Sequence, residues 1–188
     1  IADGITEVIV QPTHVINGIE NDLMKEDALA FKNRFERITF GDPLLTTQQD
    51  HVEIVNAICQ EFSNLPADCA LILMGHGTSH YANDVYAALD YRFKDLGFSN
   101  IHLATVEGYP TLENVTRMVK EQEAKKVILA PFMIVAGDHA RNDMSGDDED
   151  SWKNQFRAAG YDVECRIKGL GEYPAIQDML IRHVTEVC

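Results

Sequence analysis

Three short segments of the sequence hold side chains that can bind a metal ion or move a proton. The first, MGHGTSH at 74–80, places His76 between two glycines. The second, VEGYP at 106–110, contributes Glu107, and the third, AGDHA at 136–140, contributes His139. Imidazole and carboxylate together suit a divalent first-row metal such as Co²⁺, Ni²⁺, Fe²⁺ or Zn²⁺. Three protein ligands would leave coordination positions open for exchange, as a working site requires.

Each of the three segments also has a purely structural interpretation. A glycine-rich turn can cradle a phosphate, but the GxGxxG pattern and the Walker lysine are absent from the sequence. Taken alone, Glu107 is a solvated loop carboxylate and His139 is a surface or helix-capping residue. A hydrolase that uses Ser79 would need a GxSxG elbow, which this segment does not form. His80 is interpreted as a polar residue in the first turn of a helix.

Apolar runs alternate with segments of helical period along the chain, which is typical of a parallel sheet covered on both faces. Strands are predicted over 8–14, 37–40, 70–74, 100–104, 126–135 and 162–166. Helices are predicted over 20–35, 47–62, 83–96, 112–124, 149–159 and 174–187. Right-handed crossovers then make a doubly wound α/β topology the expected one. In such a sheet the strands end at one edge, where we expect His76, Glu107 and His139 to meet.

Several residues are predicted to mark helix ends. Thr46 or Thr47 is the expected N-cap of the helix over 47–62, and Pro174 suits the first turn of the last helix. Ser145 is predicted to cap the helix over 149–159. The acidic run at 147–150 is then the negatively charged first turn of that helix, favoured by the helix dipole. A second interpretation is that this run draws cations toward the sheet edge.

The chain contains an internal similarity. VIVQP and a following glycine at 8–18 align without gaps on VILAP and a following glycine at 127–137, which predicts two similar α/β halves. We expect 1–65 to be the remainder of an N-terminal α/β domain without its first strand and helix, and 66–188 to be a C-terminal α/β domain with the metal site. The expected missing segment is roughly 50 to 70 residues, more than the ~30 of one βαβ unit.

The remaining histidines are assigned from their positions in the pattern. In the alignment of the two halves, His14 takes the position of Met133. It therefore faces either a cleft between the halves or the core. Three others fall inside predicted elements and are interpreted as structural or exposed residues: His51, His102 and His183.

Composition narrows the range of partners. The 188 residues include 30 acidic and 16 basic side chains, giving a formal net charge of −14. Such a field disfavours nucleic acid and anionic membranes and favours a cation. No apolar run approaches the ~18 residues that span a bilayer. The four cysteines are scattered, which indicates a reducing compartment. The cytoplasm is therefore expected, with the periplasm as the alternative because the chain begins at Ile1 rather than Met.

The motifs resemble a known family over essentially the whole chain. MGHGTSHYANDVYAALD at 74–90, VEGYP at 106–110, the segment at 131–160 and GLGEYPAIQDML at 169–180 resemble the anaerobic sirohydrochlorin cobaltochelatases of the CbiK type. VIVQPTHVINGIE at 8–20 and GDPLL at 41–45 extend the resemblance into the first half. These enzymes belong, with the ferrochelatases, to the class II chelatase superfamily.

The resemblance implies a fold, an activity and a site. It implies two similar doubly wound domains that face a cleft for a tetrapyrrole, and insertion of Co²⁺ into sirohydrochlorin in anaerobic cobalamin biosynthesis. The family's two histidines fall on His76 and His139 and its glutamate on Glu107, as metal ligands and catalytic residues. No nucleotide is implied. Arg141 is a candidate partner for the carboxylates of the substrate.

Some alternatives stay open from the sequence. The same fold serves iron and nickel chelatases, so Fe²⁺ or Ni²⁺ in place of Co²⁺ is one alternative. A carrier that binds a metal or a tetrapyrrole without catalysis is another, because a fold does not fix a function. The sequence also leaves open whether the chain forms a homo-oligomer.

Overall fold

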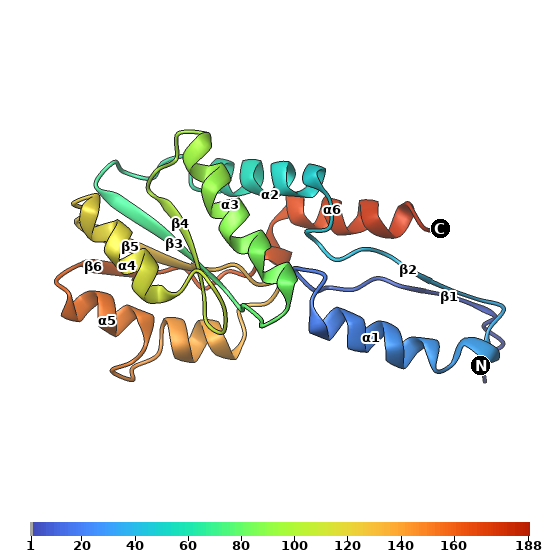
Figure 1. Ribbon diagram of the computed structural model, residues 1–188. Coiled ribbons are helices and arrows are strands. Elements are labelled where there is room, and N and C mark those ends of the chain that lie inside the picture. Colours follow the sequence, from blue (N-terminus) through green and yellow to red (C-terminus); the bar gives the residue numbers. More distant parts are fainter. Residues whose placement is uncertain (1) are drawn as a thin grey trace.

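The computed structural model describes residues 2–188 and contains two parallel sheets (Figure 1). The smaller sheet pairs β1 (Glu7–Val10) with β2 (Arg37–Phe40). The larger has the order β4-β3-β5-β6 and is formed by β3 (Cys69–Gly75), β4 (Ile101–Thr105), β5 (Lys126–Pro131) and β6 (Asp162–Cys165). All strand pairs are parallel, which confirms the predicted α/β class.

Residues 2–188 form six α-helices: α1 (Ile19–Leu29), α2 (Gln48–Glu61), α3 (Asp84–Asp95), α4 (Leu112–Glu121), α5 (Trp152–Ala158) and α6 (Pro174–Thr185). The first five connect consecutive strands, and α6 follows β6. Short single turns stand at Lys32–Arg34, Tyr81–Asn83, Ala140–Met144 and Leu170–Glu172. In Figure 1, β1, β2 and α1 extend to the right of the larger sheet, and α2 lies beside α3 and α6. Within residues 2–188, no helix is both long enough and apolar enough to cross a bilayer.

Helices cover both faces of the larger sheet, as the doubly wound topology requires. All seven residues of β3 are buried. Leu71 and Leu73 belong to a core with residues of α2, α3 and α6, whereas Ile72 and Met74 belong to a second core with residues of α4 and α5. This alternation follows from the two-residue period of a strand buried on both faces.

The first core joins helix α2 to the larger sheet. Ile54 and Ile58 of α2 pack in the same cluster as Leu71 and Leu73 of β3. Helix α2 therefore covers the larger sheet, although it follows the smaller sheet in the sequence. The division into 1–65 and 66–188 stays a prediction, and its first residue lies outside the described residues.

Two predicted helix ends are confirmed. Thr47 is the N-cap of α2: its hydroxyl accepts a hydrogen bond from the Asp50 amide at 3.2 Å, and the Asp50 carboxylate accepts one from the Thr47 amide at 2.7 Å. This reciprocal pair satisfies two backbone donors at the start of the helix. Pro174 is the first residue of α6.

The prediction for the helix over 149–159 is wrong at its start. Helix α5 begins at Trp152 and is capped by Ser151, whose hydroxyl accepts from the Asn154 amide at 3.3 Å. The acidic run at 147–150 therefore precedes the helix instead of forming its first turn. The Ser145 hydroxyl instead donates to the carbonyl of Ala140 at 2.8 Å and closes the preceding turn.

Three predicted elements are shorter in the structure. The strand over 8–14 ends at Val10, and the strand over 126–135 ends at Pro131. The helix over 20–35 ends at Leu29 and is followed by a separate 3₁₀ turn. Strand pairing sets the two strand ends, because β1 and β5 stop where the ladders to β2 and β3 stop.

Candidate metal centre

The structure brings His76, Glu107 and His139 together at the carboxyl edge of the larger sheet. Their ligand atoms lie within 4.8 Å of one another. The two imidazole rings are 4.8 Å apart between centroids and meet nearly at right angles, at 83°. Two donors about 2.1 Å from one ion lie at most about 4.2 Å apart, so the side chains need to approach one another only slightly to share an ion. We call these three residues the metal centre.

His76 directly follows the last residue of β3. Its Nδ1 lies 2.8 Å from the carbonyl oxygen of Gly77. Because a carbonyl can only accept, Nδ1 carries the hydrogen and donates it, which leaves Nε2 free for a metal ion. Gly77 has a φ of +83°, and a Cβ there would lie 2.5 Å from the amide nitrogen of Gly108. This close approach explains why a glycine follows His76.

Glu107 is held beside His76 by the backbone. Its amide donates to the carbonyl of His76 at 2.8 Å, and its carboxylate Oε2 lies 4.0 Å from His76 Nδ1. The Glu107 side chain is 57% exposed and the His76 side chain 43% exposed. Solvent and ions can therefore reach both groups.

A buried asparagine ties together the two loops that carry His76 and Glu107. The side-chain oxygen of Asn83 accepts from the Thr78 amide at 3.0 Å, and its amide nitrogen donates to the Tyr109 carbonyl at 2.7 Å. Asn83 is 7% exposed. Sequence reasoning missed this residue, because no local pattern predicts a hydrogen bond between residues 26 positions apart.

His139 stands eight positions beyond the end of β5, not directly after a strand. The intervening chain is held by a distant segment: the Leu170 amide donates to the Met133 carbonyl at 2.8 Å, and the Gly171 amide donates to the Ile134 carbonyl at 3.0 Å. His139 then begins the π-helical turn Ala140–Met144. The extra segment thus carries the imidazole back to the edge where β3 and β4 end.

Sequence reasoning also missed the partner of His139. The His139 Nδ1 lies 2.5 Å from Oδ2 of Asp143. A carboxylate accepts the Nδ1 hydrogen, so His139, like His76, leaves Nε2 free. The spacing of four residues between a histidine and an aspartate was the available signal, because it places both on one face of a helical turn.

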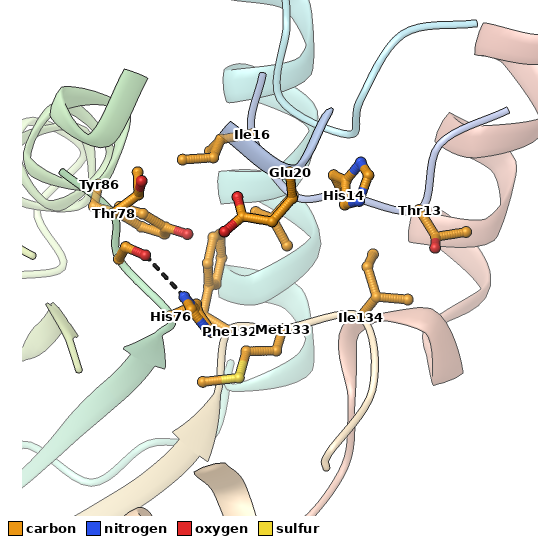
Figure 2. Close-up of a pocket in the computed structure, with 12 residues that line it drawn as sticks. Thr13, His14, Ile16, Glu20, His76, Thr78, Tyr86, Phe132, Met133 and Ile134 are labelled. Carbon is orange, nitrogen blue, oxygen red and sulfur yellow. Dashed lines mark hydrogen bonds between the residues drawn. The ribbon is translucent and has the colours of Figure 1, made fainter. Parts of the chain in front are cut away.

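A cavity of about 220 Å³ adjoins the metal centre and lies between residues of the segment 13–20 and residues of the segment 76–134. Figure 2 shows Glu20 and His14 on one side of it and His76, Phe132 and Met133 on the other. His14 and Met133, which the internal alignment matches, therefore line the same cavity. Among the described residues that line the cavity, Glu20 is the only carboxylate, and sequence reasoning missed it.

The other titratable residues singled out from the sequence lie outside the metal centre. His80 is the N-cap of the 3₁₀ turn Tyr81–Asn83, accepting from the Ala82 amide at 3.2 Å, so it lies just before this turn and not within the first turn of a helix as predicted. Arg141 is exposed on the π-helical turn. His51, His102 and His183 are all buried, and none belongs to the metal centre.

The family model described as cobalt chelatase (CbiK) matches residues 2–188, which is nearly the whole chain. The chain belongs to the cobalt chelatase (CbiK) family. It is 38% identical over 183 residues to the sirohydrochlorin cobaltochelatase of Salmonella typhimurium (strain LT2), a match that covers 97% of this chain and 69% of the relative. It is 33% identical over 186 residues to the sirohydrochlorin cobaltochelatase CbiKC of Nitratidesulfovibrio vulgaris (strain Hildenborough), covering 96% and 64%. The chain thus spans about two thirds of the length of these curated relatives.

Solved structures agree on the fold of this cobalt chelatase family member. SirB from Bacillus subtilis, solved with Fe³⁺, superposes with a TM-score of 0.67 at 14% identity and covers 98% of this chain and 73% of that one. DR2241 from Deinococcus radiodurans, a multi-domain protein with structural similarity to chelatases, gives 0.53 at 14% identity and covers 96% and 54%. At such low identity the likeness concerns the chelatase fold alone.

Proposed function

We propose that this chain inserts Co²⁺ into sirohydrochlorin, the metal-chelatase step of anaerobic cobalamin biosynthesis, with His76, Glu107 and His139 as the residues that receive the ion. The observation that carries the proposal is the meeting of two imidazoles and a carboxylate beside a cavity that His76 also lines. Membership of the cobalt chelatase family and the names of the two curated relatives support the same reaction.

The reaction exchanges one ion for two protons. Two inner N–H bonds of sirohydrochlorin break as its ring nitrogens bind Co²⁺, so two protons leave and the total charge is conserved. Each departing proton needs an acceptor near the ring. A neutral imidazole can accept a proton at physiological pH. His76 and His139 therefore serve as ligands before the transfer and as proton acceptors once the ion has left them.

Glu107 completes the donor set as an oxygen ligand or as a group that orients His76. Its carboxylate stands 4.0 Å from the His76 Nδ1 and is half exposed, so it can turn toward an ion with little rearrangement. Carboxylates and imidazoles together suit first-row divalent ions. The net charge of −14 adds long-range attraction for a cation.

The opposite wall of the cavity supplies two further titratable groups. Glu20 is an exposed carboxylate that lines the cavity across from His76, and His14 lines the same wall (Figure 2). The Nδ1 of His14 is buried without a hydrogen-bond partner among the described residues. A tetrapyrrole bound at the mouth of this cavity would therefore have acceptors for its two inner protons on both sides. We assign Glu20 as an acceptor on the wall opposite the metal centre.

The compartment proposed for this reaction is the cytoplasm. All four cysteines are free thiols in the structure. Free cysteines are the rule where glutathione and thioredoxin keep thiols reduced.

An insertion assay tests the proposed function. The full-length protein is mixed with sirohydrochlorin and Co²⁺, and the change in the absorption bands is followed with time. We expect His76→Ala and His139→Ala each to lower kcat/KM by more than about 100-fold, above the 10–100-fold typical of groups that only orient a ligand. His80→Ala, a histidine on the same loop outside the metal centre, is the matched control and should keep the wild-type rate. Near-normal insertion by both alanine variants would refute the assignment, and bands that do not change with time would indicate a carrier.

A further inference from the structure

We propose that Asp143 is a positioning residue that makes His139 the anchoring ligand of the Co²⁺, so that His76 is the ligand that yields the ion to the macrocycle. The inference rests on the proposed function, because it assigns unequal roles to the two histidines of the metal centre.

The two imidazoles have different partners behind them. His139 donates its Nδ1 hydrogen to the Asp143 carboxylate over 2.5 Å, whereas His76 donates to the neutral carbonyl of Gly77 over 2.8 Å. Both bonds fix the tautomer and leave Nε2 free. The Glu107 carboxylate lies 4.0 Å from His76 Nδ1, beyond hydrogen-bond distance. Only His139 is thus hydrogen-bonded to a negative charge, which makes its opposite ring nitrogen a stronger donor to a metal ion. His139 is therefore the better ligand of the pair.

The turn that carries His139 and Asp143 is fixed at both ends. The Arg141 amide donates to the Gly137 carbonyl at 3.1 Å at its start, and the Gly146 amide donates to the Asn142 carbonyl at 2.9 Å at its end. The side chains of Ala140 and Met144, within the turn, are buried in the second core. Asp143 is thus held at a set position relative to His139 by the backbone between them.

The position of the cavity separates the two histidines further. His76 lines the cavity, and His139 is not among its lining residues. The side chain of His139 is also less exposed than that of His76, 32% against 43%. An ion that moves from the metal centre to a ring bound at the mouth of the cavity therefore leaves His139 first and His76 last.

Three variants of Asp143 in the full-length protein test this asymmetry. Asp143→Ala removes the acceptor, Asp143→Asn removes the charge but keeps an acceptor oxygen, and Asp143→Glu restores a carboxylate. Asp148→Asn is the matched control, because it removes one acidic charge from the neighbouring loop, where the Asp148 carboxylate contacts no described basic or donor group. The measurements are the Kd for Co²⁺ without tetrapyrrole, by calorimetry, and KM for Co²⁺ and kcat in the insertion assay.

We expect Asp143→Ala and Asp143→Asn to raise the Kd and the KM for Co²⁺ by about 10–100-fold. The loss of kcat should be smaller than the rise in KM, and Asp143→Glu should recover part of the affinity. The ¹⁵N NMR signals of the His139 ring should show one tautomer in the wild type and a mixture in Asp143→Ala, with Asp148→Asn like the wild type. A purely structural role would not change this tautomer ratio.

The outcomes separate this inference from the proposed function. If His139→Ala abolishes insertion while Asp143→Ala and Asp143→Asn bind Co²⁺ like the control, the anchoring role is refuted and the proposed function stands. A fall in kcat with an unchanged Kd would refute it too, because Asp143 would then act in proton removal. If the wild type itself leaves the absorption bands unchanged with time, the proposed function fails; if His139→Ala inserts Co²⁺ normally, the assignment of His139 as a metal ligand fails.

Discussion

The metal centre and a buried cluster between α2 and α6 are built from the same kinds of side chain, but their pairing differs. In the buried cluster, His183 places Nδ1 3.1 Å from the Asp42 carbonyl and Nε2 2.9 Å from the Asp50 carboxylate. Arg182 donates to the same carboxylate at 2.7 Å. In the metal centre, His76 and His139 each use one ring nitrogen and leave the other free.

The buried cluster and the metal centre also differ in the exposure of their side chains. Asp50 is fully buried and His183 is 2% exposed, whereas the three side chains of the metal centre are a third to more than a half exposed. Burial alone would raise the pKa of the Asp50 carboxyl. The hydrogen bonds from Arg182, from the Thr47 backbone and from His183 outweigh it and lower the pKa from 3.8 to about 2. Complete pairing thus makes a histidine–carboxylate group structural, and incomplete pairing leaves it free to bind an ion.

The largest effect is expected when the buried cluster loses its central carboxylate, that of Asp50. Asp50→Ala leaves Arg182 and His183 without their shared partner, and loss of one member of a buried ion pair is strongly destabilising. We expect a loss of about 3 kcal/mol in the free energy of unfolding, measured by urea denaturation. The folded fraction should keep the wild-type Kd for Co²⁺. A loss below about 1 kcal/mol would mean that the pairing contributes little.

The second largest effect is expected at Asn83, whose side chain joins the loops that carry His76 and Glu107. Asn83→Ala removes two buried hydrogen bonds and leaves the Thr78 amide and the Tyr109 carbonyl unpaired. We expect about 2 kcal/mol of destabilisation in thermal denaturation. Unlike Asp50→Ala, this variant should also raise the Kd for Co²⁺, because the loops of His76 and Glu107 lose their common support. An unchanged Kd would show that the backbone bond between Glu107 and His76 suffices.

The stability that the Asp50 carboxylate contributes should fall with pH in the acid range. The folded state binds the Asp50 proton more weakly than the unfolded chain does, since its pKa is about 2 against 3.8. The resulting stability, about 2 kcal/mol, is fully present above pH about 4 and is lost as the pH falls toward 2. Asp50→Asn should flatten this part of the plot of unfolding free energy against pH. Parallel curves for the variant and the wild type would contradict the low pKa.

The smallest expected effect concerns the wall opposite the metal centre. Glu20→Gln keeps the size of the side chain and removes its ability to accept a proton. We expect kcat for Co²⁺ insertion to fall about tenfold, less than the 10²–10⁴-fold typical of a general base, because water and the two histidines remain as acceptors. The Kd for Co²⁺ without tetrapyrrole should not change. A raised Kd with normal kcat would instead make Glu20 part of the metal site.

Local patterns were enough to predict the strands and the three meeting residues. The buried runs that became β3 and β4 end next to His76 and Glu107, so their positions follow from sheet geometry. The same reasoning placed His139 at this edge, although the strand before it was predicted to be longer than it is. The chain from Pro131 to His139 still returns to the same edge, because backbone bonds from Leu170 and Gly171 hold it there.

Long-range contacts account for what the sequence did not predict. Asn83 acts on a carbonyl 26 positions away, and Glu20 faces His76 only because the two parts of the chain pack around one cavity. Ser151, rather than Ser145, caps α5, because Ser145 is already used to close the π-helical turn. Each of these depends on which segments meet in space, and a pattern within one segment does not contain that information.

As the proposed third ligand, Glu107 would offer oxygen, not nitrogen or sulfur, from a side chain that is more than half exposed. Water competes well with such a donor for the ion, which would shorten the residence time of the ion on the protein. A thiolate at the same place would hold soft and borderline metals far longer. The carboxylate thus suits a protein that must release its cargo at every turnover, and a cysteine there would favour storage over delivery.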